Sequence, residues 1–286
     1  FSKLAIINLY DIIACMKVLD LSVIIPFKDH PSMTIDCLKS LASCPIKEIL
    51  LVNNGSSSST MDQIKAYSAN IKNIKLLHYN HKFNYQKINN WAAAQAKGKV
   101  LWLLNNDVEA TSPDLIEYMY HKALEPKVGA VGCVLLYGDR KTVQHAGVYL
   151  VPGGTADHLY IRKKLSSLLE DEGLPYNFKE DLPLAAVTAA CLMVEKVKFD
   201  KIGGLNEDFI ITGGDVDLCL RLADKKFAPI LVGYNHGHMI HKESVSRSHL
   251  GIPYVDFVES YKIYSKHFST DNGDGFIDVR KLKGYK

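Results

Sequence analysis

The sequence lacks the features that mark membrane-spanning or nucleic-acid-binding proteins. No apolar run approaches the ~20 residues that a transmembrane helix needs, so no spanning segment is expected. The 34 Lys and Arg residues nearly balance the 31 Asp and Glu residues. The resulting net charge of +3, without any long basic run, gives no reason to expect nucleic acid as a partner.

Cysteine pairs at metal-binding spacing are also missing. The chain has six cysteines and no CxxC pair, so neither a zinc site nor a disulfide framework is predicted. Several cysteines stand inside apolar runs, which favours buried free thiols in a reducing compartment. They are Cys15, Cys37, Cys44, Cys133, Cys191 and Cys219. The start at Phe1 rather than Met indicates a piece of a longer protein or added residues.

What the chain does have is a regular alternation of apolar runs and amphipathic segments. Its 286 residues, 47% of them hydrophobic, are enough for a full core. The alternation predicts an α/β fold with a mostly parallel central sheet flanked by helices. Strands are expected at 21–27, 48–52, 75–79, 100–104, 129–137, 191–195, 229–232 and 238–240, and helices at 31–43, 58–70, 84–97, 215–225 and 254–267, with a further helix capped by Ser112 and a polar region at 153–184.

Polar residues follow three of these strands where each apolar run ends. They are Pro26–Asp29, Asn53–Ser56 and Asn105–Asp107. Because the carboxyl ends of parallel strands share one edge of a sheet, these residues predict a ligand-binding cleft. Asp107 could hold a divalent cation there, and a cation can hold a diphosphate. Taken alone, each segment also fits an ordinary polar turn.

The second half of the chain offers two further candidates. Asp215 follows Gly213-Gly214 at the expected start of a helix, where it is either a helix cap or a general base facing the cleft. Asp217, one turn later, also fits a first-turn acid. His241 follows a short strand and precedes Arg247 by six positions, so the pair could supply a metal ligand and a phosphate clamp.

In combination these residues resemble family 2 glycosyltransferases with the GT-A fold, of the bacterial group that builds surface polysaccharide. The resemblance covers 21–247, with the motifs in order. They are Ser22-Val-Ile-Ile-Pro26, Cys37-Leu-Lys-Ser-Leu41, Val52-Asn-Asn-Gly-Ser56, Phe83-Asn-Tyr85, Ile88-Asn-Asn90, Leu104-Asn-Asn-Asp107, Gly129-Ala-Val-Gly132, Leu136-Tyr137, Gln144-His-Ala-Gly147, Ala190-Cys-Leu192, Gly203-Gly204, Asp215-Val-Asp-Leu-Cys-Leu-Arg221 and His241-Lys-Glu-Ser244.

The resemblance implies an inverting transfer of a sugar from a nucleotide diphosphate sugar (a UDP- or dTDP-sugar) to a hydroxyl of a glycan or lipid-linked acceptor. It implies Asp215 as the base, and Asp107 with His241 as ligands of Mn²⁺ or Mg²⁺. The remaining implied contacts are Pro26, Asp29, Asn53, Asn105, Asn106 and Arg247 for the nucleotide sugar, and Asp217, Gln144 and His145 for the acceptor. The implied location is the cytoplasm, peripheral to the inner membrane face.

The implied organisation is an extension or linker at 1–20, a GT-A domain at 21–250 and a C-terminal helical extension at 251–286. Within the domain, 21–107 would bind the nucleotide and 108–250 the acceptor. Two positions depart from the family's pattern. Asn53 replaces a carboxylate that many members use to bind the base, although an amide can still hydrogen-bond a uracil edge. Gly214 replaces an acidic or amide residue before the base.

Three alternatives fit parts of the sequence. A degenerate module that binds a glycan or a partner without catalysis is the main one. A nucleotidyltransferase is disfavoured, because Lys28-Asp-His-Pro31 lacks a glycine-rich basic loop after the first strand. A calcium loop at 271–278 is also disfavoured. With Gly275 in its sixth position, Thr270 and Lys281 occupy the first and twelfth, where acids belong, so a Gly-Asp turn is expected.

Overall fold

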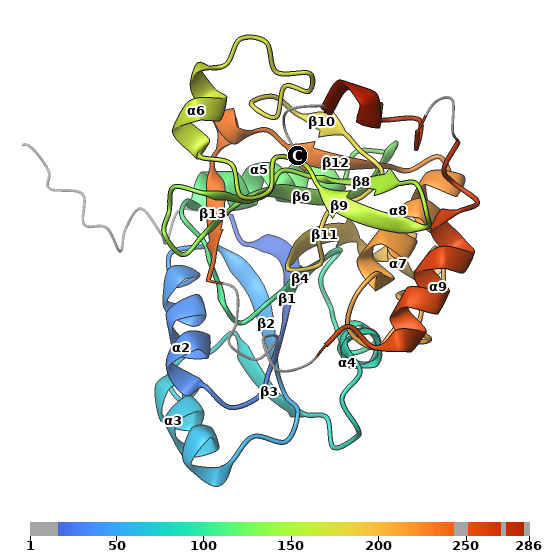
Figure 1. Ribbon diagram of the computed structural model, residues 1–286. Coiled ribbons are helices and arrows are strands. Elements are labelled where there is room, and N and C mark those ends of the chain that lie inside the picture. The colour runs from blue at the N-terminus through green and yellow to red at the C-terminus, as the bar shows by residue number, and fades with distance from the viewer. Residues whose placement is uncertain (1–16, 243–250, 270–272, 283–286) are drawn as a thin grey trace, which may run out of the picture.

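The computed structural model describes residues 17–242, 251–269 and 273–282. Figure 1 shows a large twisted sheet with helices on both faces. The strand order along the sheet is β10-β12-β6-β11-β4-β1-β2-β3; β7 and β13 also pair with β6, and β5 pairs with β13. This mixed α/β architecture confirms the predicted fold class.

The first half of the sheet is parallel, as the alternation predicts. β1 (Leu19–Phe27) pairs in parallel with β2 (Ile46–Asn53) and with β4 (Val100–Leu104), and β2 pairs in parallel with β3 (Ile74–His78). The connections run through the helices α2 (Pro31–Ser40), α3 (Ser58–Ser68) and α4 (Tyr85–Ala93). The three polar strand ends therefore lie along one edge of the sheet, as predicted.

The second half departs from the parallel pattern at one strand. β11 (Cys191–Glu195) lies antiparallel between β4 and β6 (Val128–Tyr137). Beyond β6, β12 (Ala228–Val232) is parallel and β10 (Leu182–Pro183) is antiparallel to it. An apolar run reveals that a strand is buried on both faces, but it carries no information about direction.

Two short strands bring the second half back to the carboxyl edge of β4. β13 (His238–His241) is parallel to β6 and antiparallel to β5 (Val108–Glu109), with His241 opposite Val108. β7 (Val143–His145) pairs antiparallel with the opposite edge of β6. The turn after β4 and the end of β13 are therefore neighbours, although they are more than 130 residues apart in sequence.

The pocket described below is closed by a hairpin and two helices. The hairpin consists of β8 (Val148–Val151) and β9 (Thr155–His158), and the helices are α8 (Gly214–Asp224) and α9 (Tyr254–Tyr264). Figure 1 shows α9 beside α8 and below the end of β9. The segment expected as a C-terminal extension thus packs onto the rest of the domain. The remaining elements are α5 (Pro113–Ala123), α6 (Leu165–Glu170), α7 (Lys196–Lys201) and the 3₁₀ turns η1 (Tyr234–His236) and η2 (Val279–Leu282).

Apolar side chains fill both faces of the sheet. Ile24 of β1 packs into one core, while Val23 and Ile25 pack into the other, and all three are fully buried. A strand buried on both faces reads as a continuous apolar run, which is why this strand was recognisable. The five described cysteines are buried and free, as predicted, and Cys15 lies outside the described residues. Among the described helices, none combines the length and apolarity required to cross a bilayer.

Candidate active site

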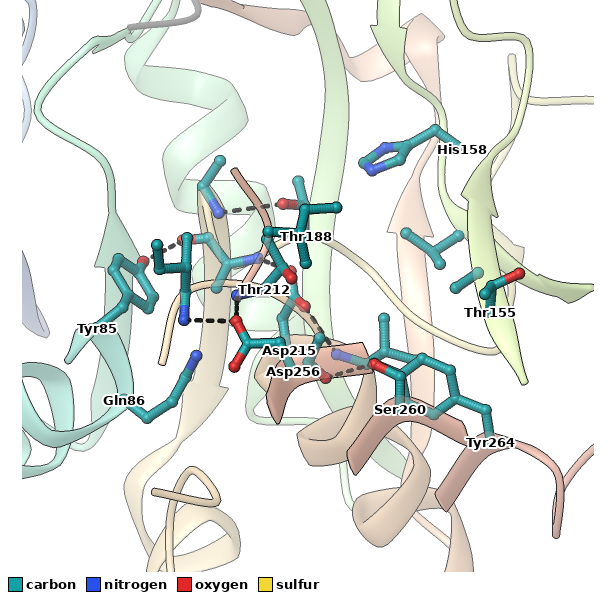
Figure 2. Close-up of a pocket in the computed structure, with 18 of the residues that line it drawn as sticks. Tyr85, Gln86, Thr155, His158, Thr188, Thr212, Asp215, Asp256, Ser260 and Tyr264 are labelled. Carbon is teal, nitrogen blue, oxygen red and sulfur yellow. Dashed lines mark hydrogen bonds between the residues drawn. The ribbon is translucent and has the colours of Figure 1, made fainter. Parts of the chain in front are cut away.

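A pocket of about 330 Å³ lies between the carboxyl edge of β4, the hairpin β8–β9 and the helices α4, α8 and α9 (Figure 2). Its wall carries polar groups from five separate parts of the chain. Among them are Gln86 of α4, Asn105 after β4, His158 of β9, Asp215 of α8 and Ser260 of α9. A concave site with a few convergent polar groups is the usual form of a small-molecule site.

Asp215 stands on the pocket wall in the first turn of α8. The helix begins after Gly213, whose φ of 88° is the left-handed conformation that glycine adopts without strain. One carboxylate oxygen of Asp215 accepts a hydrogen bond from the backbone N–H of Ala189 at 3.0 Å, and the other accepts one from Val216 at 2.9 Å. The helix N-terminus also favours the ionised carboxylate. These contacts hold the side chain of Asp215 in a fixed position at the pocket.

A network of hydrogen bonds links this carboxylate to the turn after β4. The Tyr85 hydroxyl lies 3.0 Å from the backbone oxygen of Ala189 and 3.2 Å from Oδ1 of Asn105. Ala189 in turn donates its N–H to Asp215. Through Asn105, the Asn105–Asp107 motif therefore reaches the wall of the pocket.

Asp107 and His241 meet at the carboxyl edge of the sheet, where both are buried. Oδ1 of Asp107 lies 3.2 Å from Nε2 of His241. On its other side, Nδ1 of His241 lies 2.9 Å from Oε1 of Gln144, and an amide oxygen can only accept a hydrogen bond. His241 therefore carries a proton on Nδ1, so a neutral ring turns the lone pair of Nε2 toward the carboxylate. Two lone pairs facing each other favour a cation between them or a proton on Nε2.

This donor set fits a divalent cation. Carboxylate and imidazole both ligate Mn²⁺, and a second partner that fixes the tautomer of a ligating His is usual at metal sites. Within the described residues there is no group of three or more His, Cys, Asp or Glu side chains that could hold a metal ion. Two protein ligands leave the remaining positions for water and for phosphate oxygens.

His145 contacts His158 and does not line the pocket. Its Nδ1 is 2.8 Å from Nδ1 of His158, and it is fully buried. Burial lowers the pKa of His145 well below its usual value, with His158 and His241 adding to the effect, so His145 is neutral. His158 is the member of this pair that reaches the pocket (Figure 2). Gln144 and His145 thus support the two histidines instead of lining the cavity.

The predicted nucleoside contacts lie at the ends of β1 and β2. Asn53 is buried, with Oδ1 accepting from Ser56 N–H at 2.9 Å and Nδ2 3.3 Å from Nδ1 of His78. Asp29 accepts from Ser57 N–H at 2.9 Å, and this bond lowers the pKa of its carboxyl. Pro26 pairs with Val52 between the two strands. The three residues share one edge, and the hydrogen bonds of Asp29 and Asn53 join the ends of β1, β2 and β3 to one another.

Three other expected site residues are placed differently. Asn106 turns toward α2, where its Nδ2 donates to Thr34 Oγ1 at 2.9 Å. Asp217 does not line the pocket; it is buried and pairs with Arg221 at 2.6 Å, while burial raises the pKa of its carboxyl. Arg247 lies outside the described residues.

Several pocket residues were not identified from the sequence. They are Gln86, His158 and, on α9, Asp256, Phe257, Ser260 and Tyr264. The carboxylate of Asp256 is fully buried and accepts hydrogen bonds from the backbone N–H groups of Ile210, Ile211 and Thr212. These contacts join segments more than 40 residues apart, and no local pattern signals them.

The sequence profile of glycosyl transferase family 2 matches residues 22–176, more than half of the chain. Two relatives are similar over most of it. One is the O-antigen biosynthesis protein RfbC of Myxococcus xanthus, 36% identical over 247 residues, or 85% of this chain. The other is the uncharacterized protein y4gI of Sinorhizobium fredii, 34% identical over 244 residues, or 81% of this chain. The chain spans only 19% and 25% of the lengths of these relatives.

Solved glycosyltransferase structures share the fold at low sequence identity. A mannosyltransferase of Pyrobaculum calidifontis, in complex with GDP-Man and Mn²⁺, superposes with a TM-score of 0.58 at 11% identity, covering 94% of this chain and 75% of that one. GalNAc-T7 with UDP, GalNAc and Mn²⁺ gives 0.64 at 13% identity, covering 94% and 54%. Staphylococcus aureus TarS with UDP-GlcNAc gives 0.59 at 14% identity, covering 89% and 68%. The fold is therefore the GT-A fold, as predicted.

Proposed function

The chain belongs to glycosyl transferase family 2, and from this premise we propose that it is an inverting glycosyltransferase acting on a nucleotide diphosphate sugar. The observation that carries the proposal is Asp215, a carboxylate held by two backbone N–H groups on the wall of a pocket. A fixed base is what a single displacement requires on the acceptor side. The similarity to a protein of O-antigen biosynthesis supports a sugar hydroxyl of a glycan or lipid-linked acceptor as the nucleophile.

In this proposal Asp215 removes the proton of the attacking hydroxyl. The hydroxyl oxygen then bonds to the anomeric carbon of the donor sugar, and the bond from that carbon to the nucleoside diphosphate breaks. Because attack and departure occur on opposite faces of the sugar, the anomeric configuration inverts. The N–H of Ala189 keeps the carboxylate in place during this transfer, and Tyr85 keeps Ala189 in register with Asn105.

Asp107 and His241 are the residues that would hold Mn²⁺ or Mg²⁺. Such an ion, when bound, supplies positive charge that stabilises the leaving diphosphate. Gln144 orients His241 by accepting its Nδ1 proton, so that Nε2 is available for ligation. Two solved structures with this fold contain Mn²⁺, which supports a divalent cation as the cofactor.

We propose that Pro26, Asp29 and Asn53 contact the nucleoside, because they stand at the ends of the two strands next to β4. Asn105 and Asn106 would lie near the diphosphate, and Arg247 is proposed as a further contact. Of the three neighbours with this fold, one is in complex with UDP, one with UDP-GlcNAc and one with GDP-Man. A UDP- or dTDP-sugar is proposed here, because the amide of Asn53 can pair with the edge of a uracil or thymine.

The test begins with a donor screen. Nucleotide sugars are ranked by the thermal stabilisation they give with Mn²⁺, since a ligand that binds the folded state raises the melting temperature. Release of nucleoside diphosphate from the best donor is then measured for the wild type and for Asp215→Asn. We expect the variant to bind the donor normally and to lose turnover by roughly 10²–10⁴-fold, the usual contribution of a general base.

The matched control is Asp224→Asn, which makes the same change at the exposed end of α8. It should keep wild-type turnover. Near-normal release by Asp215→Asn would show that Asp215 is not the base. The wild type could instead bind a nucleotide sugar and release no nucleoside diphosphate, whether water or an acceptor is present to take the sugar. That result would favour the binding module without catalysis.

A further inference from the structure

A second depression, of about 420 Å³, lies beside α4 and shares no lining residue with the pocket that holds Asp215. We call it the α4 depression. It is lined by Tyr79, His81, Lys87, Asn90, Trp91 and Glu207. Positions 87, 90 and 91 are three or four residues apart on α4, so their side chains share one face of the helix. Because no lining residue is shared, the depression and the pocket can be occupied at the same time.

The α4 depression has an aromatic wall that solvent can reach. The side chain of Trp91 is 36% exposed. Its ring centroid lies 5.5 Å from that of Tyr79, and the centroid of Tyr79 lies 5.0 Å from that of His81, both in edge-to-face arrangements. These contacts hold the indole in place from one side. Tryptophan is usually highly buried, so an indole left open in a depression indicates a contact surface for a ligand.

Polar groups of both charges accompany this wall. Glu207 supplies a carboxylate and Lys87 an ammonium, and both residues are exposed. One carboxylate oxygen of Glu207 accepts a hydrogen bond from Nδ2 of Asn90 at 3.0 Å, which leaves the other oxygen for a ligand. The two charges cancel, so the depression has no net attraction for a phosphate or another anion. Its groups suit an uncharged molecule that both donates and accepts hydrogen bonds.

Both sides of the α4 depression are fixed by hydrogen bonds to the rest of the fold. Nδ2 of Asn54, just after β2, donates to the backbone oxygens of Tyr79 and His81, each at 3.0 Å. The Asn90 amide donates to the backbone oxygen of Leu205 at 2.8 Å and accepts from the N–H of the same residue at 2.9 Å. A site held in this way loses little conformational freedom when a ligand binds.

We propose that the α4 depression binds one neutral pyranose unit of a glycan, with the sugar ring stacked on Trp91 and a hydroxyl donating to Glu207. A pyranose has an apolar face of C–H groups and an edge of hydroxyls, which match an aromatic wall beside a carboxylate. The inference goes beyond the proposed function, because binding at this site requires neither a nucleotide sugar, a metal ion nor Asp215.

The test uses the fluorescence of Trp91. The chain has two tryptophans, and the other, Trp102 of β4, is fully buried, so a ligand in the depression changes chiefly the emission of Trp91. Methyl glycosides of glucose, galactose, mannose, N-acetylglucosamine and rhamnose are titrated into the full chain without nucleotide or metal. We expect at least one to change the emission, with a dissociation constant on the order of 1 mM, as a small ligand in an open site implies. Trp91→Phe should abolish the signal.

A change at the carboxylate tests the polar contact while the reporter stays in place. Glu207→Gln keeps the shape of the side chain and removes its charge. We expect the dissociation constant of the best glycoside to rise roughly fivefold, because a hydrogen bond to a charged group is about twice as strong as one to a neutral group. Asp208→Asn is the matched control, since it removes the same charge at the next residue, which is exposed and does not line the depression. It should leave the dissociation constant unchanged.

Three results would overturn the inference. They are an unchanged emission with every glycoside, a signal that survives Trp91→Phe, and equal losses of affinity in Glu207→Gln and Asp208→Asn. Tighter binding of glucose 6-phosphate or UMP than of every neutral glycoside would also overturn it, because the depression would then select an anion. Failure of the proposed function is recognised separately, by a wild type that releases no nucleoside diphosphate from any nucleotide sugar.

Discussion

Replacing Asp256 by Ala should destabilise the protein strongly, although Asp256 is not proposed to take part in catalysis. Its carboxylate receives the N–H groups of Ile210 at 2.6 Å, and of Ile211 and Thr212 at 2.9 Å. The side chain is fully buried, and it ties α9 to the loop that leads into Asp215. The alanine variant leaves three backbone donors without their partner.

The size of the effect follows from these three bonds. A hydrogen bond to a charged group contributes about 1.5–3 kcal/mol, so three set an upper bound of roughly 4.5–9 kcal/mol. Water reaching the loop and the removal of a buried charge offset part of this sum. We expect a loss of about 3–4 kcal/mol, against a total stability of about 5–15 kcal/mol for a typical protein.

The assay is equilibrium unfolding in urea, with Asp256→Ala compared with wild type and with Glu259→Ala. Glu259 lies on the same helix and pairs with the exposed Lys262 at 2.7 Å, so its removal should cost below about 1 kcal/mol. Asp256→Asn keeps one acceptor oxygen and should fall between the two. A loss below about 1 kcal/mol for Asp256→Ala would refute the reasoning, because the loop would then be held by other contacts.

Three further predictions concern the metal pair and two carboxylates. Asp107→Ala should abolish the additional thermal stabilisation that Mn²⁺ gives with a nucleotide sugar, and an unchanged Mn²⁺ effect would contradict the metal site. Arg221→Met leaves Asp217 as a buried carboxylate whose pKa burial already raises, so the variant should lose about 3–5 kcal/mol at neutral pH and regain stability as the pH is lowered and the carboxylate is protonated. A variant whose unfolding free energy is independent of pH would argue against this pair. Asp29→Asn should make the free energy of unfolding fall less steeply in acid. The bond from Ser57 lowers the pKa of Asp29, so the stabilisation by the Asp29 carboxylate is present above its unfolded pKa of about 3.9 and is lost as the pH falls through its folded pKa. Parallel acid-unfolding curves for variant and wild type would count against it.

Much of the fold was predictable because local patterns determine it. The apolar runs of β1, β2 and β4 are continuous, and helices separate them, so a parallel arrangement with one common polar edge follows. The position of Asp215 at the start of α8 was readable from the glycines before it. The pairing of Asp217 with Arg221 was not predicted, although residues four apart on a helix face each other.

The rest depends on contacts between distant segments. The direction of β11 is decided by its neighbours β4 and β6, and not by its own residues. The role of α9 was hidden because Tyr254, Phe257 and Tyr261 remain exposed apolar residues, so its pattern does not show which face is buried. A Cβ atom at Gly214 would lie 2.5 Å from Cδ of Gln86, so the two residues fit each other; they are 128 positions apart, and neither signals the contact locally.

The position of His241 at the end of a short strand limits how the preceding turn can change during evolution. His241 faces Asp107 because β13 is aligned with β5 and β6, with His241 opposite Val108 and Tyr137. A strand alternates its side chains, so a shift of one residue would turn His241 to the other side. We therefore expect the turn at 233–237 to accept no change in length, and Gly233, where a Cβ would lie 2.3 Å from the backbone of Glu180, to accept no other residue. Both the length of this turn and its glycines therefore determine where the side chain of His241 lies.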